Sequence, residues 1–287
     1  MWLRTTAAHQ RASPPSGRCV RLTPTLFPMT VVTRTDVARR AVTSGAQFYV
    51  RMAAACVAVA VIGFAPTYWL PLFRGTLDVP RIAHVHAAVF YGWTLLFLLQ
   101  TRLAAARKVP RHRAWGVFGV ALATTMCFVG MAAAITSLKQ STADGFGDAV
   151  RAFTIIPVSG IVFFAVLFTV ALLEIKRLET HKRLMLVATV SLLQAAVGRW
   201  FVIFLAPASI GAGPVGPPPV FVTVMPGLVS DLLIVAAMVH DRRTIGRVHP
   251  VYWIAGGALV AVQVLRVPLS STTAWTHIAN WLLTLSL

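Results

Sequence analysis

Apolar residues fill seven long stretches of this chain, and short segments rich in charge, proline and glycine separate them. The stretches cover residues 48–70, 82–105, 114–137, 152–174, 183–206, 220–240 and 250–268. Each contains roughly 19–25 residues, which at about 1.5 Å per helical residue crosses a hydrocarbon core about 30 Å thick. The pattern therefore predicts an all-α fold, a polytopic transmembrane helical bundle of about seven spans.

The connecting segments alternate along the chain between ones rich in Lys and Arg and ones poor in them. Segments on one side of the predicted bundle contain 16 Lys and Arg residues, whereas those on the other side contain only Arg74, Arg81, Lys139 and Arg151. Loops that carry positive charge stay in the cytoplasm during insertion. The alternation thus predicts a multi-pass protein with a cytoplasmic N-terminus. The excess of Arg over Lys is typical of GC-rich bacterial genomes and indicates a bacterial inner membrane.

At 57% hydrophobic and 12% charged residues, the chain is too apolar for a soluble globular domain. Its net charge of +18 lies mostly in short predicted cytoplasmic loops, where it faces lipid phosphates. The predicted partner is therefore the lipid bilayer with anionic headgroups. Nucleic acid is not expected as a partner, because no basic face or base-stacking platform lies outside the predicted spans.

The flanking segments differ from the membrane domain, which we place at residues 48–270. Residues 1–47 are polar and rich in Arg, Ser, Thr and Pro, which predicts a disordered N-terminal segment. Two alternatives apply to it: a transit peptide, or a true start at Met29. Residues 271–287 are too short to span, and Trp275 and Trp281 favour an interfacial C-terminal helix.

The histidines of the predicted bundle fall into two layers, one near each membrane face. Histidine is the commonest metal ligand and the usual axial ligand of haem, and two layers are the arrangement of a transmembrane two-haem electron conduit. The alternative is that interfacial histidines only hydrogen-bond loops or lipid phosphates. The candidate ligands of haem b or a divalent metal are His86, His112, His181 and His249.

The second stretch carries a polar stripe. His86, Trp93 and Gln100 recur at seven-residue intervals and share one helix face. His84 lies roughly 200° from His86 around the helix. A metal site made by His84 and His86 therefore requires an irregular first turn after Pro80, and otherwise the stripe simply faces the bundle interior.

Asp231 is the only carboxylate inside a predicted span, and Arg199 and Arg266 lie nearer the outer ends of theirs. An ionisable side chain at this depth costs at least about 2.5–3.5 kcal/mol and should face the interior. Asp231 and Gln194 lie at similar heights, so we expect them to hydrogen-bond. A buried structural ion pair or a snorkelling Arg is the alternative. The predicted polar intramembrane cavity is lined by Gln100, Gln194, Arg199, Asp231 and Arg266.

The runs HVHAAVFYGWTLLFLLQ, HKRLMLVATVSLLQAAVGRW and DRRTIGRVHPVYWIAGG resemble a family of uncharacterised bacterial multi-pass membrane proteins. The resemblance implies the same topology and no particular reaction. His86 and His112 more loosely resemble the haem ligands of cytochrome b561-like proteins, although this chain has more spans. The positions that carry the first resemblance are His84, His86, Gln100, His112, His181, Lys182, Arg183, His249 and Pro250.

No HExxH, GxSxG or P-loop motif is present in the sequence, nor a GxGxxG in a strand–helix context, so no catalytic residue is assigned. Three functions remain open. The first is a redox protein that binds haem or metal through the layered histidines. The second is a small-molecule or lipid transporter or binding protein that uses the polar cavity, and the third is an accessory membrane subunit without chemistry of its own.

Overall fold

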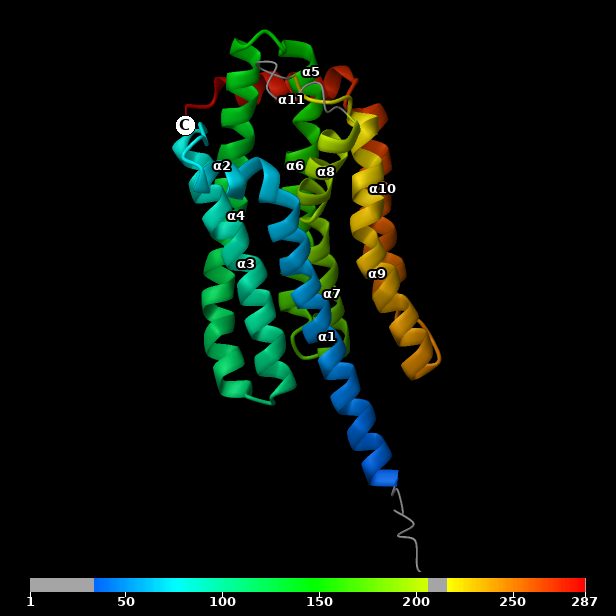
Figure 1. The fold of residues 1–287 in the computed structure, drawn as a ribbon. Helices are drawn as coiled ribbons and strands as arrows, with labels where there is room; N and C mark the ends of the chain where they lie inside the picture. The colour runs from blue at the N-terminus through cyan, green and yellow to red at the C-terminus, as the bar shows by residue number, and fades with distance from the viewer. Residues whose placement is uncertain (1–33, 206–215, 287) are drawn as a thin grey trace, which may run out of the picture.

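The computed structural model describes residues 34–205 and 216–286, and these residues form helices without any strand. Seven of the helical segments are long and apolar enough to cross a membrane, so the prediction of an all-α, seven-span bundle is confirmed (Figure 1). The chain is a multi-pass membrane protein. Its spans are Gly45–Phe73, Arg81–Ala105, Val109–Ala143, Gly147–Leu173, Leu178–Phe204, Val220–Ile245 and Tyr252–Leu269.

The helices follow one another in antiparallel order with short connections, which favours packing between neighbours in the chain. Helix α3 packs on α4 and α1, α6 packs on α7, and α8 packs on α1 and α9. The elements are α1 (Arg34–Phe64), α2 (Leu70–Phe73), α3 (Arg81–Ala105), α4 (Val109–Ala143), α5 (Gly147–Phe153), α6 (Ile155–Leu173), α7 (Leu178–Ser191), α8 (Gln194–Leu205), α9 (Val224–Ile245), α10 (Gly257–Leu269) and α11 (Thr273–Thr284).

Several helix boundaries differ from those expected from the sequence. Helix α1 begins at Arg34, so it includes residues that we assigned to the N-terminal segment, while residues 1–33 and Met29 lie outside the described part. Helix α9 continues to Ile245 and so contains Asp241. Apolar periodicity marks only the membrane-embedded part of a helix, and polar turns at its ends carry no such signal.

Four of the spans are irregular within the bundle. A π-helical turn, Ala65–Trp69, follows α1 at Pro66, and another, Tyr252–Gly256, precedes α10. A 3₁₀ turn, Val220–Thr223, precedes α9. Between α7 and α8, Leu192 and Leu193 donate to the carbonyls three residues earlier, which tightens the backbone there. Such interruptions release backbone polar groups for other partners and often occur at functional sites.

Aromatic packing centres the core between α3, α6 and α7. Trp93 is 2% exposed and its ring lies edge-on to Phe164 and Phe168, with centroids 5.1 and 5.5 Å apart. Its indole N–H donates to Thr189 Oγ1 at 3.3 Å, which satisfies the only polar atom of that ring. The predicted stripe of α3 therefore faces the interior at Trp93.

Helix α11 lies across one end of the bundle, beside α5 (Figure 1). The Thr272 hydroxyl caps its first turn by accepting from the Trp275 backbone N–H. The Trp275 indole donates to the Arg151 carbonyl at 2.7 Å, and Leu282 is buried beside Leu138. The structure thus has the expected C-terminal helix, and its location at the membrane interface stays a prediction.

Helix α1 packs directly on the backbone of α8 at Gly63. A Cβ there would lie 2.6 Å from the carbonyl oxygen of Ala196, so we expect Gly63→Ala to cost about 1–3 kcal/mol of unfolding free energy through overpacking. The change should lower the melting temperature of detergent-purified protein. Gly257→Ala is the matched control, because nothing lies within 4 Å of a Cβ at that position. Equal melting temperatures of the two variants would contradict this contact.

Candidate functional site

Two clusters of buried polar side chains lie at different heights in the bundle. We call the end with the connections 106–108, 174–177 and 246–249 the basic end, because most loop Arg and Lys residues lie there. The opposite end, where α5 and α11 lie, is the α11 end (Figure 1). One cluster lies near the basic end, and the other lies nearer the α11 end.

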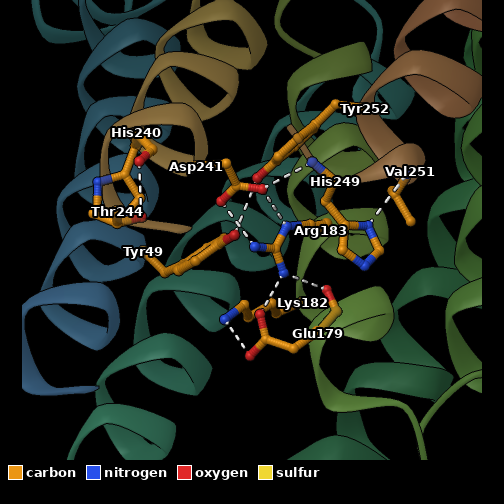
Figure 2. Close-up of polar contacts among 10 residues, drawn as sticks. All are labelled: Tyr49, Glu179, Lys182, Arg183, His240, Asp241, Thr244, His249, Val251 and Tyr252. Atoms are coloured by element: carbon orange, nitrogen blue, oxygen red, sulfur yellow. Dashed lines mark hydrogen bonds and ion pairs between the residues drawn. The ribbon is translucent and has the colours of Figure 1, made fainter. Parts of the chain in front are cut away.

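The first cluster is built on an ion pair between α7 and α9 (Figure 2). Arg183 donates through Nε to Asp241 Oδ2 at 2.9 Å and through Nη2 to Asp241 Oδ1 at 2.8 Å. Both side chains are 2% exposed. A bidentate pair of this geometry is among the stronger protein hydrogen-bonding arrangements, and in the bundle it joins two helices 58 residues apart in the chain.

Groups from three further segments complete the first cluster. Arg183 Nη1 donates to the carbonyl and the carboxylate of Glu179, one helical turn earlier. The His249 backbone N–H donates to Asp241 Oδ2 at 3.3 Å. Beside the pair, the Tyr49 and Tyr252 hydroxyls lie 3.0 Å apart and so connect α1 to the last span (Figure 2).

His249 belongs to this cluster through its ring as well as its backbone. Its Nδ1 accepts the Val251 backbone N–H at 3.3 Å, an interaction that requires a neutral imidazole with its proton on Nε2. Burial lowers the pKa of His249, and the nearby charge of Arg183 lowers it further. The ring therefore accepts a backbone hydrogen bond at the start of the last span, although we had assigned His249 as a candidate cofactor ligand.

We did not predict this cluster from the sequence, although Arg183 and His249 are among the positions that carry the family resemblance. We expected Asp231 to be the only carboxylate inside a span, and that statement is wrong, because Asp241 and Glu179 also lie in spanning segments. The sequence contained a signal for it. Asp241 is an isolated acidic residue beside Arg242 and Arg243 in a region that is otherwise positively charged, which indicates that its carboxylate has a specific partner. The partner itself follows only from helix packing.

The second cluster forms where the break before α8 and the 3₁₀ turn before α9 meet the last turns of α10. Arg266 on α10 is 3% exposed and donates through Nη1 to Gln194 Oε1 at 3.0 Å. Its Nη2 donates to the carbonyl and hydroxyl oxygens of Thr223 at 3.2 and 3.1 Å. Gln194, the first residue of α8 after the break, donates to the same Thr223 carbonyl at 3.1 Å. Gln194 thus bonds Arg266 and Thr223 instead of the expected Asp231.

Beside these bonded groups lie polar atoms that have no hydrogen-bond partner among the described residues. They are both carboxylate oxygens of Asp231, both amide atoms of Gln263 and Nε of Arg266. Asp231 and Gln263 are 7% and 1% exposed. The Gln263 amide lies beside the Asp231 carboxylate without a hydrogen bond of good geometry between them, and the Arg266 charge also acts on that carboxylate. Native proteins rarely leave so many buried polar atoms unpaired, and such groups call for a water, an ion or a ligand.

A glycine holds Gln263 in this position. A Cβ at Gly227, on α9, would lie 2.8 Å from the amide carbon of Gln263. The amide therefore packs directly on the α9 backbone, one turn from Asp231. The local geometry depends on the absence of a side chain at Gly227.

The structure brings together three of the five residues of the predicted cavity: Gln194, Asp231 and Arg266. Arg199 is exposed, and its guanidinium lies 5.5 Å from the Phe64 ring centroid. Gln100 lies at the basic end, where it donates to the His112 carbonyl at 3.1 Å. Gln263 and Thr223 are the members that sequence reasoning missed, because an amide and a hydroxyl in an apolar run give no distinct pattern.

The histidines have different surroundings. His84 Nδ1 lies 3.0 Å from the Tyr68 hydroxyl, whereas the His86 ring stacks on Phe90 at 4.1 Å. Because α3 is helical from Arg81 onward, His84 and His86 point to different sides, and a shared metal site lacks geometric support. Within residues 34–205 and 216–286, no three His, Cys, Asp or Glu side chains converge as a metal site would require.

His112 on α4 and His181 on α7 both lie at the basic end, and the charge of His181 acts on the His112 imidazole. His181 Nδ1 lies 2.7 Å from the Ala171 carbonyl and must donate to it, which leaves Nε2 open. His112 Nδ1 is buried and has no partner in the described part of the chain. Among the four histidines expected to bind haem or metal, His112 and His181 are thus the two that lie near each other at the basic end.

Comparison with protein-family models, curated proteins and solved structures finds no match to the chain.

Disrupting the ion pair should reveal its structural role. Removing one member of a buried pair leaves an uncompensated charge and typically costs about 3–5 kcal/mol, so we expect Asp241→Asn and Arg183→Met each to lower the melting temperature strongly. The double variant should recover part of the loss. Arg177→Gln is the control, because its pair with Glu174 is exposed and worth less than about 1 kcal/mol. Additive losses in the double variant would contradict a direct interaction.

Proposed function

We propose that this membrane protein binds a small polar solute between α8, α9 and α10, as the binding site of a transporter or solute receptor. The observation that carries the proposal is the set of unpartnered polar atoms on Asp231, Gln263 and Arg266. We call these three residues, with Gln194 and Thr223, the polar site.

The position of the polar site supports binding. Gln194 opens α8 at a break within one span, and Thr223 ends the 3₁₀ turn of the next. Interrupted helices near the middle of a membrane are the usual construction of solute sites in transporters, because their free backbone groups line the site. Here the Thr223 carbonyl accepts from both Arg266 and Gln194.

The donors and acceptors define the class of solute. Asp231 offers two carboxylate acceptors, Gln263 offers one acceptor and one amino group, and Arg266 offers one remaining donor at Nε. A matching solute carries donors for Asp231 and an acceptor for Arg266. Small amino acids, amino alcohols and polyols meet this condition, whereas a bare cation is disfavoured by the Arg266 charge.

Gln263→Met tests the polar site without knowledge of the solute. Both amide atoms lack partners, and each unsatisfied buried group costs about 1–3 kcal/mol, so the ligand-free variant should melt at a higher temperature than the parent protein. Gln194→Met is the matched control: its amide is bonded to Arg266 and Thr223, and its loss should lower the melting temperature. Destabilisation by both changes would assign Gln263 a structural role.

A ligand screen tests the solute class. Amino acids, amino alcohols and polyols are added to the detergent-purified protein, and thermal stabilisation is measured. We expect at least one compound to stabilise the parent protein and to lose its effect in Asp231→Asn, which keeps the shape but removes the charge. Stabilisation that persists in Asp231→Asn would place binding elsewhere. Uptake of the compound into proteoliposomes then separates a transporter from a receptor.

A second candidate function is haem binding in a redox role, which the His112–His181 arrangement favours. A ligating histidine commonly donates its other ring nitrogen to a carbonyl, which fixes the tautomer, and His181 has this bond to Ala171. These residues fit the axial ligands of a haem b, which would supply one-electron chemistry. The accessory-subunit alternative gains no specific support from the described residues.

The absorption spectrum of purified protein distinguishes this second function. If His112 and His181 are axial ligands, the protein shows a Soret band that His181→Ala abolishes and that His84→Ala leaves intact, because His84 is bonded to Tyr68. A colourless protein with the melting behaviour of a folded bundle would refute the haem hypothesis and leave the polar site unaffected.

The proposal includes the orientation of the protein and the membrane in which it lies. The excess of Lys and Arg at the basic end supports a cytoplasmic location of that end, and the polar site then lies in the outer half of a bacterial inner membrane. The resemblance to bacterial multi-pass proteins is likewise a proposal, carried by the histidine-containing runs of the sequence.

A further inference from the structure

A groove of about 500 Å³ runs along the outside of α9 and is closed on one side by α1. Because the groove lies on a different face of α9 from the polar site, its occupant is independent of the proposed function. Its lining residues are Phe48, Leu232, Val235, Ala236, Val239, His240 and Arg243.

The floor of the groove is an apolar stripe. Leu232, Val235, Ala236 and Val239 repeat at three- and four-residue spacing, so they share one face of α9. Ile234, Ala237 and Asp241 are buried on the other face. From Leu232 to Arg243 the stripe extends about 16 Å at 1.5 Å per residue, which spans much of one leaflet.

The end of the groove is basic. The His240 ring stacks on Phe48 with centroids 3.7 Å apart and an interplanar angle of 1°, which fixes its orientation against α1. One turn further along, Arg243 is exposed at the basic end. The neighbouring Arg242 is already engaged, since its guanidinium donates to the Gly246 carbonyl at 2.8 Å.

We infer that this groove binds one anionic phospholipid, with an acyl chain on the apolar floor and the phosphate at His240 and Arg243. Basic pockets between spanning helices at the cytoplasmic face are suited to anionic headgroups. A groove that is apolar along its length and cationic only at one end matches this amphiphile. It does not match a free phosphate, which has nothing to place on the floor.

A second copy of this chain matches the groove less well than an anionic phospholipid does. It would have to present a carboxylate at the level of Arg243. Among the side chains that the structure describes at the basic end, Glu174 is paired with Arg177, and Glu179 and Asp241 are bonded to Arg183. A lipid phosphate supplies the missing negative charge.

Lipid titration followed by native mass spectrometry and thermal unfolding tests the inference. Phosphatidylglycerol and phosphatidylcholine with identical acyl chains are added to the full-length protein in detergent. We expect one phosphatidylglycerol molecule to bind with clear preference and to raise the melting temperature. Arg243→Gln should weaken that binding about fivefold, the contribution of one basic residue at a membrane surface. Val235→Trp, which fills the floor without changing charge, should abolish it.

Arg247→Gln is the matched control, because it removes the same charge from an exposed position of the adjacent loop outside the groove. It should retain binding. If Arg243→Gln and Arg247→Gln weakened phosphatidylglycerol binding equally, the lipid would be attracted by the general surface charge and not by a specific site. Unchanged binding in Val235→Trp, saturation by glycerol phosphate alone, or a dimer that phosphatidylglycerol does not affect would each overturn the inference.

Discussion

The requirement that a charge within a membrane bundle find a partner governs the arrangement of these helices. Arg183 and Asp241 meet it completely: every guanidinium nitrogen donates, and both carboxylate oxygens accept. Because the pair also receives the His249 backbone N–H, it links α7, α9 and the entry to the last span at one point. The helices cannot separate there without leaving an unpaired charge in a medium of low dielectric constant.

The polar site obeys the same requirement only in part. Arg266 is satisfied at its two terminal nitrogens by Gln194 and Thr223, whereas Asp231 and Gln263 have no bonded partner among the described residues. The contrast between the two clusters is the physical basis for proposing a structural role for the first and solute binding for the second. Replacing a fully paired residue leaves its partner without a hydrogen bond and destabilises the fold. A buried polar group without a partner can instead gain hydrogen bonds when a ligand binds.

Helix irregularity connects these clusters with the fold. Regular helices satisfy their own backbone groups and offer a bundle only side chains. The 3₁₀ turn ending at Thr223 provides a backbone acceptor to Arg266, and the Gln194 side chain, directly after the break, provides a second acceptor. Helix α9 thus has two distinct faces, one buried beside the polar site and one along the groove.

The sequence by itself determined the all-α class, the seven spans and the approximate depth of Asp231, Gln194 and Arg266. Apolar length and charge alternation are properties of the chain that need no knowledge of packing. Only the tertiary structure decided which polar groups meet. In the structure Arg183 pairs with Asp241, Arg199 and Gln100 lie away from Asp231, and Gln263 lies beside it. These contacts depend on which helices are neighbours and on the direction in which each side chain points around its helix, and neither can be read from the sequence. The helix end at Ile245, beyond the apolar run, was also not predicted, because polar turns at the end of a helix carry no apolar periodicity.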